Sequence, residues 1–163
     1  MDDSFEDLVP ESHTRLWEHF NALALQALRA KVVRMVKQVE QAIPTNQTTP
    51  LTWNHLEDEE GWHVDGRAEV IVPAGLYMCT ATVEFEPMPG AKGERSTWFW
   101  TPDGPAGDTS TPPNPASTTR VTIASHVRMS AEGPISVYAY HTQGESVKIL
   151  KHRSAFQVSR MGD

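Results

Sequence analysis

A run of alternating residues in the centre of the chain constrains its fold more than any other feature. One set of side chains in this run is apolar or small (Tyr77, Cys79, Ala81, Val83 and Phe85), and the set between them is polar (Thr80, Thr82, Glu84 and Glu86). Successive side chains of a β-strand point to opposite faces of a sheet. The pattern therefore predicts a strand with one face in a core and the other in solvent.

Short segments of the same kind follow one another along most of the chain. The predicted strands span residues 51–54, 68–72, 76–86, 95–101, 119–129, 135–141, 146–151 and 154–160. Turn residues such as Pro89-Gly90 and Gln143-Gly144 separate them, and no helical pattern lies between them. This order is typical of a mainly β protein that folds as a β-sandwich. The domain is expected to span residues 51–163.

The stretch 102–117 interrupts the strand pattern with prolines (Pro102, Pro105, Pro112, Pro113 and Pro115). Proline has no N–H to donate to a strand ladder, so this stretch is predicted to be a long exposed loop. A loop of this length either contacts a partner or is simply solvated.

The N-terminal part has a different character. Residues 1–10 form a short acidic arm, and residues 11–44 are rich in Ala, Leu, Gln, Arg and Lys without an internal Gly or Pro. Ser12 is a suitable N-cap and Pro44 a suitable stop, so a long α-helix is predicted between them.

Apolar residues recur along this predicted helix at steps of three and four. They are Leu25, Leu28, Val32, Met35, Val39 and Ala42. This is a heptad seam, but it is shorter than the seams that define a coiled coil. The seam can pack on its own domain or a neighbour, form a short self-associating coil, or bind another protein.

Composition excludes several classes of function. The 163-residue chain carries a net charge of −7, which argues against nucleic acid as the main partner. No apolar run is long enough to span a membrane, and no signal-peptide pattern opens the sequence. The chain is therefore expected to be made in a cytoplasm. Its single Cys79 cannot form an internal disulfide and is expected to be a small buried residue.

The titratable residues form no catalytic motif. None of the G-x-S-x-G, H-E-x-x-H, P-loop or dinucleotide-binding patterns occurs. Glu84 and Glu86 share a strand face and are expected to lie in solvent. The acidic run between His55 and His63 lacks the spacing of a calcium loop. We therefore expect no enzyme activity, no cofactor and no metal.

Four passages together resemble the C1q/TNF-like jelly roll, in the form found in bacteriophage virion proteins of tails, fibres or head decorations. They are Trp62-His63-Val64-Asp65, Val72-Pro73-Ala74-Gly75-Leu76-Tyr77, the hairpin that runs from Val127 to Tyr140, and Ser154-Ala155-Phe156-Gln157-Val158. The resemblance covers about the C-terminal two-thirds of the chain. Two features depart from the pattern: Pro134 follows Gly133 where an acidic residue is usual, and the proline-rich loop is long.

The resemblance implies a jelly-roll β-sandwich that trimerises about a threefold axis through a flat, apolar and aromatic face. The strand 135–141 carries apolar or aromatic residues on both faces, whereas a lone sandwich buries only one face of each sheet. The candidate subunit interface therefore consists of Trp98, Trp100, Tyr138 and Tyr140. Trp62 is a candidate surface-binding residue.

The resemblance and these features predict a non-enzymatic bacteriophage virion structural protein that forms a homotrimer. It would be a minor tail, tail-tip or fibre-type protein. The N-terminal helix would attach it to other virion proteins. One alternative is a head decoration protein at threefold positions of the capsid. A second, from another class, is a carbohydrate-binding module in which Trp62, Trp98 or Trp100 contacts a host cell-surface glycan. Nucleic acid and membrane are not expected partners.

Overall fold

The computed structural model describes residue 18, residues 31–90 and residues 92–162. The chain divides into two units, Met1–Ala30 and Lys31–Asp163, and every named strand belongs to the second. Within the described residues from Lys31 onward, the secondary structure is β and contains no helix.

Two antiparallel sheets form the second unit. The strands are β1 (Val32–Val36), β2 (Gln41–Ile43), β3 (Thr49–Pro50), β4 (Asn54–Asp58), β5 (Glu69–Val72), β6 (Gly75–Phe85), β7 (Arg95–Thr101), β8 (Gly104–Thr111), β9 (Thr119–Met129), β10 (Gly133–His141), β11 (Val147–Ile149) and β12 (Ala155–Gly162). Sheet A has the order β2-β11-β6-β12-β1-β4, and β9 pairs with β6. Sheet B has the order β3-β10-β7-β8, and β5 also pairs with β10.

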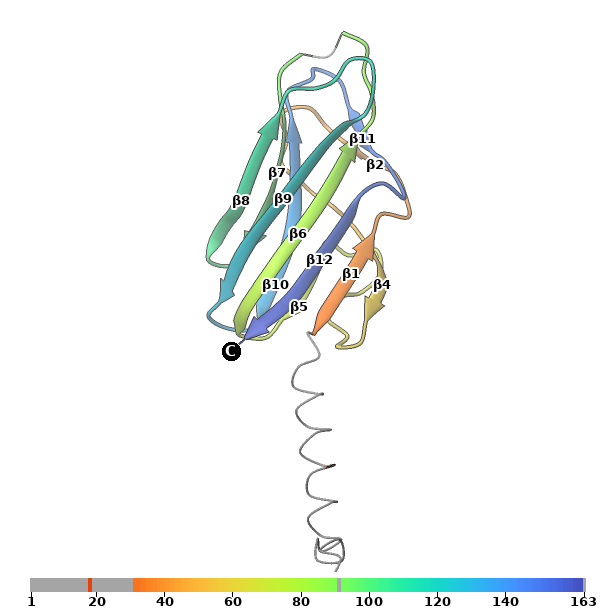
Figure 1. The fold of residues 1–163 in the computed structure, drawn as a ribbon. Helices are drawn as coiled ribbons and strands as arrows, with labels where there is room; N and C mark the ends of the chain where they lie inside the picture. Colours follow the sequence, from red (N-terminus) through yellow and green to blue (C-terminus); the bar gives the residue numbers. More distant parts are fainter. Residues whose placement is uncertain (1–17, 19–30, 91, 163) are drawn as a thin grey trace, which may run out of the picture. The chain divides into compact units, whose positions relative to one another are not determined.

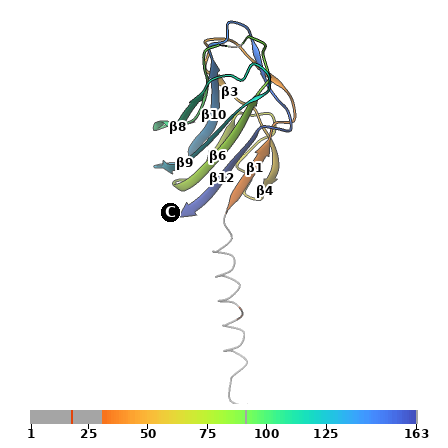
Figure 2. The ribbon, with the colours of Figure 1, turned by 45° about the horizontal axis from the view of Figure 1, so that its top comes forward.

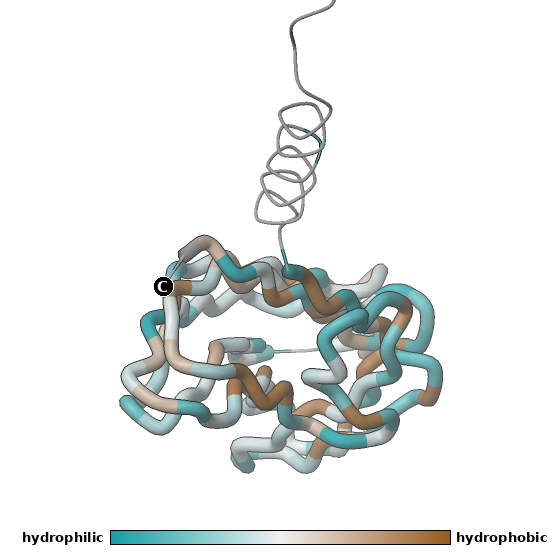
Figure 3. The backbone as a smooth tube through the Cα atoms, turned by 90° about the horizontal axis from the view of Figure 1, so that it is seen from below, coloured by the Kyte–Doolittle hydropathy of each residue, from teal (hydrophilic) through white to brown (hydrophobic). Residues whose placement is uncertain are grey.

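The sheets lie face to face. Figure 1 shows β9, β6, β12, β1 and β4 of sheet A side by side in front of sheet B. Figure 2 separates the layers, with β8 and β10 on one side and β6, β12 and β1 on the other. The view from below in Figure 3 shows apolar segments in both layers.

The core fills the space between the sheets. The inward set predicted for β6, from Tyr77 to Phe85, is buried as expected, including Cys79. Phe156 of β12 connects the layers: its ring centroid lies 5.8 Å from that of Phe99 in sheet B and 5.8 Å from that of Trp53. Each large aromatic ring buried in this way adds a large apolar area to the core that stabilises the sandwich.

The predicted helix is wrong from residue 32 onward. Val32–Val36 is strand β1, which pairs with β12 on one side and β4 on the other. Val33 and Met35 are buried, whereas Val39 is 73% exposed between β1 and β2. A valine-rich segment whose burial alternates and which is paired on both edges is more stable here as a strand than as a helix. Leu25 and Leu28 lie outside the described residues.

This difference also moves the start of the sandwich. The described sheet begins at Val32, well before the predicted boundary at residue 51. The predicted strand at 51–54 precedes its counterpart β4, which begins at Asn54.

The predicted loop at 102–117 is partly wrong, because Gly104–Thr111 forms strand β8. β8 pairs only with β7, so it lies at the edge of sheet B. An edge strand tolerates a proline such as Pro105, because one side of its backbone has no strand to pair with.

Candidate functional site: an aromatic groove on sheet B

The aromatic residues that were predicted to protrude gather on the outer face of sheet B. Tyr138 of β10 lies directly opposite Trp98 of β7, and Ser136 lies opposite Trp100. The ring of Trp98 stacks on Tyr138 with a centroid distance of 6.1 Å and an interplanar angle of 13°. Trp100 meets the same tyrosine edge-on, also at 6.1 Å. Tyr138 thus supports both tryptophans.

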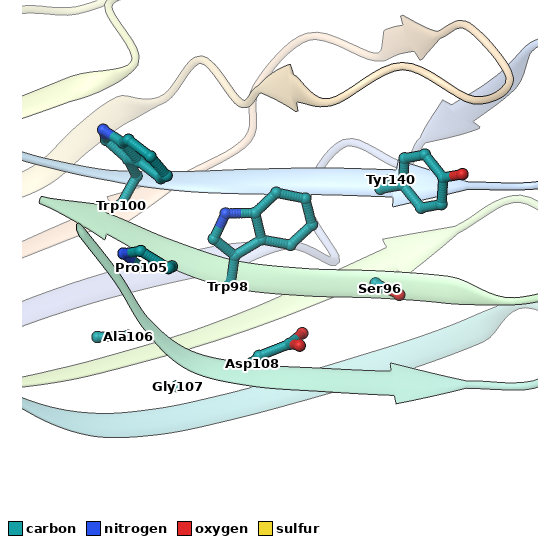
Figure 4. Close-up of a pocket in the computed structure, with 8 residues that line it drawn as sticks. All are labelled: Ser96, Trp98, Trp100, Pro105, Ala106, Gly107, Asp108 and Tyr140. Atoms are coloured by element: carbon teal, nitrogen blue, oxygen red, sulfur yellow. The ribbon is translucent and has the colours of Figure 1, made fainter.

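These side chains border a hollow of about 510 Å³. Its lining residues come from β7, β8 and β10, and are Ser96, Trp98, Trp100, Pro105, Ala106, Gly107, Asp108 and Tyr140. Figure 4 shows Trp98 in the middle of this surface, with Trp100 toward one end, Ser96 and Tyr140 toward the other, and Asp108 on the neighbouring strand. We call it the aromatic groove.

A β-bulge sets the position of Asp108. Thr97 pairs with Thr109 and Phe99 pairs with Ala106, so two residues of β8, Gly107 and Asp108, face the single residue Trp98. Gly107 has φ = 63°, a backbone conformation that favours glycine. Bulges of this kind redirect side chains and are common next to functional sites.

The groove combines aromatic faces with hydrogen-bonding groups. Among the described residues, none donates a hydrogen bond to the Asp108 carboxylate or accepts one from the Tyr138 hydroxyl; the Tyr140 hydroxyl donates to Asn46 Oδ1 at 3.3 Å. The lining residues include no His, Cys, Lys or Arg. The groove therefore offers aromatic faces and hydroxyl and carboxylate groups that suit the binding of a ligand.

The surface-binding prediction for Trp62 is wrong. Trp62 is only 8% exposed and packs edge-on against Tyr77 in the core, with centroids 5.8 Å apart. The Asp58 carboxylate accepts hydrogen bonds from the backbone N–H groups of Trp62 and His63, at 2.9 and 2.8 Å. These bonds fold the end of the acidic loop over the core. No local pattern indicates this burial, because Trp62 directly follows a run of acidic residues that favours exposure.

The outer face of sheet A differs from the aromatic groove. Its central rows contain Val32, Val36, Met78, Thr80, Thr82, Thr122, Ala124, His126, Ala155, Gln157 and Ser159, together with Arg34. We call these residues the flat face. Arg34 is the only Lys, Arg, Asp or Glu among them, and its guanidinium pairs with Glu57 at 3.0 Å.

Glu84 lies near the C-terminal end of β6. It was predicted to be an exposed acid, but it is buried. Its side chain is 2% exposed, and its carboxylate accepts hydrogen bonds from Thr118 Oγ1 (2.6 Å), Arg120 Nη2 (2.9 Å) and Arg153 Nη1 (3.1 Å). Burial alone would raise the pKa of Glu84. The hydrogen bonds from Thr118, Arg120 and Arg153 outweigh it, and the net pKa is lowered.

Other buried polar groups lie inside the sandwich. Burial raises the pKa of the Cys79 thiol to about 12, which agrees with an inert core residue. His141 is fully buried, and its Nε2 lies 2.9 Å from the carbonyl oxygen of Ile43. Arg95 is also fully buried, with its guanidinium 5.2 Å from the Phe85 ring, and the guanidinium nitrogens have no hydrogen-bond partner within the described residues.

In the described part of the chain, no three His, Cys, Asp or Glu side chains lie close enough together to hold a metal ion. No helix in that part is long and apolar enough to cross a membrane.

Comparison with known proteins gives a class of fold. No protein-family model matches the chain, and no curated protein matches it. Two crystal structures of murine APRIL, a TNF-family protein, are similar to it with TM-scores of 0.60 and 0.56. In both, the identity is 11%, and the alignment covers 82% of this chain and all of the other. The globular domain of zebrafish complement 1qA has a TM-score of 0.55 at 10% identity, over 78% of this chain and 94% of that one.

The fold is thus a mainly β sandwich of the C1q/TNF-like jelly-roll type, as the order of motifs in the sequence predicted. Identities of this size show the fold alone.

Proposed function

We propose that this protein is a non-enzymatic virion structural protein that assembles as a homotrimer through the flat face of sheet A. The observation that carries the proposal is the composition of this face. The side of a sheet that faces water normally alternates polar and charged residues against the core set. Here the central rows hold mostly small, uncharged side chains.

The geometry of the flat face suits contact with another protein. In a single copy Met78, Thr80 and Thr82 of the central strand β6 are half-buried, whereas Thr122, Ala124 and His126 of the neighbouring strand β9 are exposed, so the face has uncharged surface that a partner can cover. Cores of subunit interfaces are depleted in charged residues relative to the rest of the surface. Arg120 and Arg128 lie toward opposite ends of β9, where an interface would have its polar rim.

Threefold assembly is the arrangement that the resemblance to C1q/TNF-like jelly rolls implies. In a ring of three copies each contact is heterologous, so the flat face of one copy meets a different surface of the next. The four aromatic residues first predicted as the interface lie on the opposite sheet. Their contact with a sister copy remains a prediction. If these residues formed the interface, Trp100→Ala would lower the mass measured by light scattering.

The virion assignment is supported by the order of motifs that resembles phage jelly rolls. In this proposal the sandwich is displayed from the particle and the N-terminal segment, with Leu25 and Leu28, attaches it. We place the protein in a tail tip or fibre, with a capsid decoration role as the alternative. An antibody against the folded sandwich should label one of these sites on intact particles; unlabelled particles would contradict the assignment.

Light scattering tests the assembly. We expect the wild-type protein to have three times its 18.1 kDa chain mass at micromolar concentration. Thr80→Arg places a charge in the middle of the flat face, where a single copy can still direct it to solvent. This variant should have a smaller mass and an unchanged β-sheet circular dichroism spectrum.

Ser110→Arg is the matched control, because Ser110 is exposed on the outer edge strand β8 of the other sheet. It should keep the wild-type mass. A monomeric wild-type protein, or a Thr80→Arg variant that remains trimeric, would contradict assembly through the flat face.

A further inference from the structure

We propose that the aromatic groove of sheet B is a binding site for a neutral saccharide. In this site a sugar ring stacks on the tryptophans, and its hydroxyl groups donate hydrogen bonds to Asp108. The inference goes beyond assembly and does not rest on it, since the groove and the flat face lie on opposite sheets of the same copy.

The aromatic part of the groove is held in place before any ligand arrives. Trp98 is fixed between β10 and β8 because it stacks on Tyr138, and Trp100 is fixed by its edge-on contact with the same ring. Trp100 nevertheless remains 46% exposed. One face of a pyranose ring is a row of C–H groups, which pack against the electron-rich face of an indole. Rigid aromatic residues provide such contact area with little loss of conformational entropy.

The polar groups of the groove match hydroxyl groups. The Asp108 carboxylate is exposed, and no described residue donates to it. An ionised carboxylate accepts up to four hydrogen bonds, and a sugar presents adjacent hydroxyl donors at similar spacing. The Ser96 hydroxyl, which also lines the groove, can donate and accept at the same surface.

Charge excludes anionic ligands. The outward positions of β5, β7, β8 and β10 hold Glu69 and Asp108 but no Lys or Arg. Glu94 adds a third carboxylate at the far edge, where it accepts a hydrogen bond from Ser110 Oγ at 3.1 Å. Sulfated, phosphorylated or carboxylated sugars would meet repulsion here without a compensating cation.

Shape and solvation favour a saccharide over a second copy of the chain. The groove is a hollow of about 510 Å³, within the range of about 300 to 1,000 Å³ that is usual for small-molecule sites. A protein surface that covered it would remove water from Asp108 and would have to place hydrogen-bond donors or a cation against the carboxylate. A saccharide carries such donors in its hydroxyl groups.

The experiment uses the full chain on an array of neutral oligosaccharides built from hexoses, deoxyhexoses and N-acetylhexosamines, with sialylated and sulfated counterparts. The best neutral binder is then titrated against tryptophan fluorescence. We expect binding to neutral members only. Trp100→Ala should weaken it at least about tenfold, as removal of an aromatic anchor does in other sites, and Asp108→Asn should also weaken it.

Ile71→Ala is the matched control, because Ile71 is 45% exposed on the same face but does not line the groove. It should bind like the wild type. Stronger binding to the acidic sugars, no binding at millimolar concentration, or equal affinity of the Trp100→Ala variant would overturn the proposal. A fall in mass by light scattering for Trp100→Ala would also overturn it, because the face would then be a subunit contact. Mass and affinity are measured separately, so a monomer that binds sugar would contradict only the assembly proposal.

Discussion

At Glu84, the alternation of polar and apolar residues predicts the face of the sheet correctly but does not predict that the side chain is buried. The pattern of β6 assigns this residue correctly to the outer face, but the neighbouring strand and two loops cover it. Thr118, Arg120 and Arg153 come from parts of the chain that are 34 to 69 positions away. No local pattern in the sequence reports such contacts. The same limit applies to Trp62, whose ring packs in the core against Tyr77 of a later strand.

The lowered pKa of Glu84 makes the stability of the protein depend on pH. A carboxyl whose pKa is lower in the folded state stabilises the fold above its ordinary value of about 4.5, and this contribution is lost as the pH falls through the folded pKa. At pH 7, Glu84→Gln should therefore reduce the free energy of unfolding by about 1–3 kcal/mol, since charged hydrogen bonds are lost.

Urea unfolding of both proteins at pH 7 and pH 3 measures this contribution. The difference between wild type and Glu84→Gln should shrink at pH 3. Glu132→Gln, at an exposed turn position, should match the wild type at both values. A difference that is the same at both pH values would show that the ionised carboxylate is not what stabilises this end of the sheet.

Among the elements, the long strands were predictable and the edges of the sheets were not. Strands β6 and β9 alternate over eleven residues each, so their faces follow from sequence and their bounds nearly so. β1 is only five residues long and has a spacing that also fits a helix, so its partners β12 and β4 decide its conformation. β8 contains proline and glycine, and only its position at the edge of sheet B allows it to be a strand.

The β-bulge in β8 can be tested by substitution of Gly107. In Gly107→Ala the new Cβ would lie 2.9 Å from the Cβ of Ser125 and 3.2 Å from the Phe99 ring, with φ in the left-handed region. We expect the free energy of unfolding to fall by about 1–3 kcal/mol from the backbone strain alone, and further from crowding. Chemical denaturation followed by circular dichroism measures the change.

Gly144→Ala separates the two effects, because Gly144 has φ = 89° but open space around its Cβ position. It should lose less stability than Gly107→Ala. Equal losses would mean that β8 adjusts freely and that the bulge does not fix the position of Asp108.

For the whole molecule, the order of the strand signals predicted a mainly β sandwich, and the jelly-roll class followed from the resemblance of four passages to C1q/TNF-like domains. The aromatic residues of the groove could be placed on one face from alternation in β7 and β10. Asp108 could not be assigned to the same site, since its stretch was interpreted as a loop and the bulge depends on the register with β7. Which outer face a sister copy covers is likewise a property of the assembly, and local sequence patterns do not determine it.

Hydroxyl-radical labelling of the assembled protein, with oxidation of each side chain followed by mass spectrometry, tests most directly whether the two outer faces have different roles. Met78 of the flat face should be protected in the trimer and should become reactive in Thr80→Arg. Trp100 should react equally in both proteins, and exposed Met161 and buried Met129 mark the two limits of reactivity. The account is contradicted if Met78 reacts as fast in the wild type as in the variant, or if assembly protects Trp100 instead.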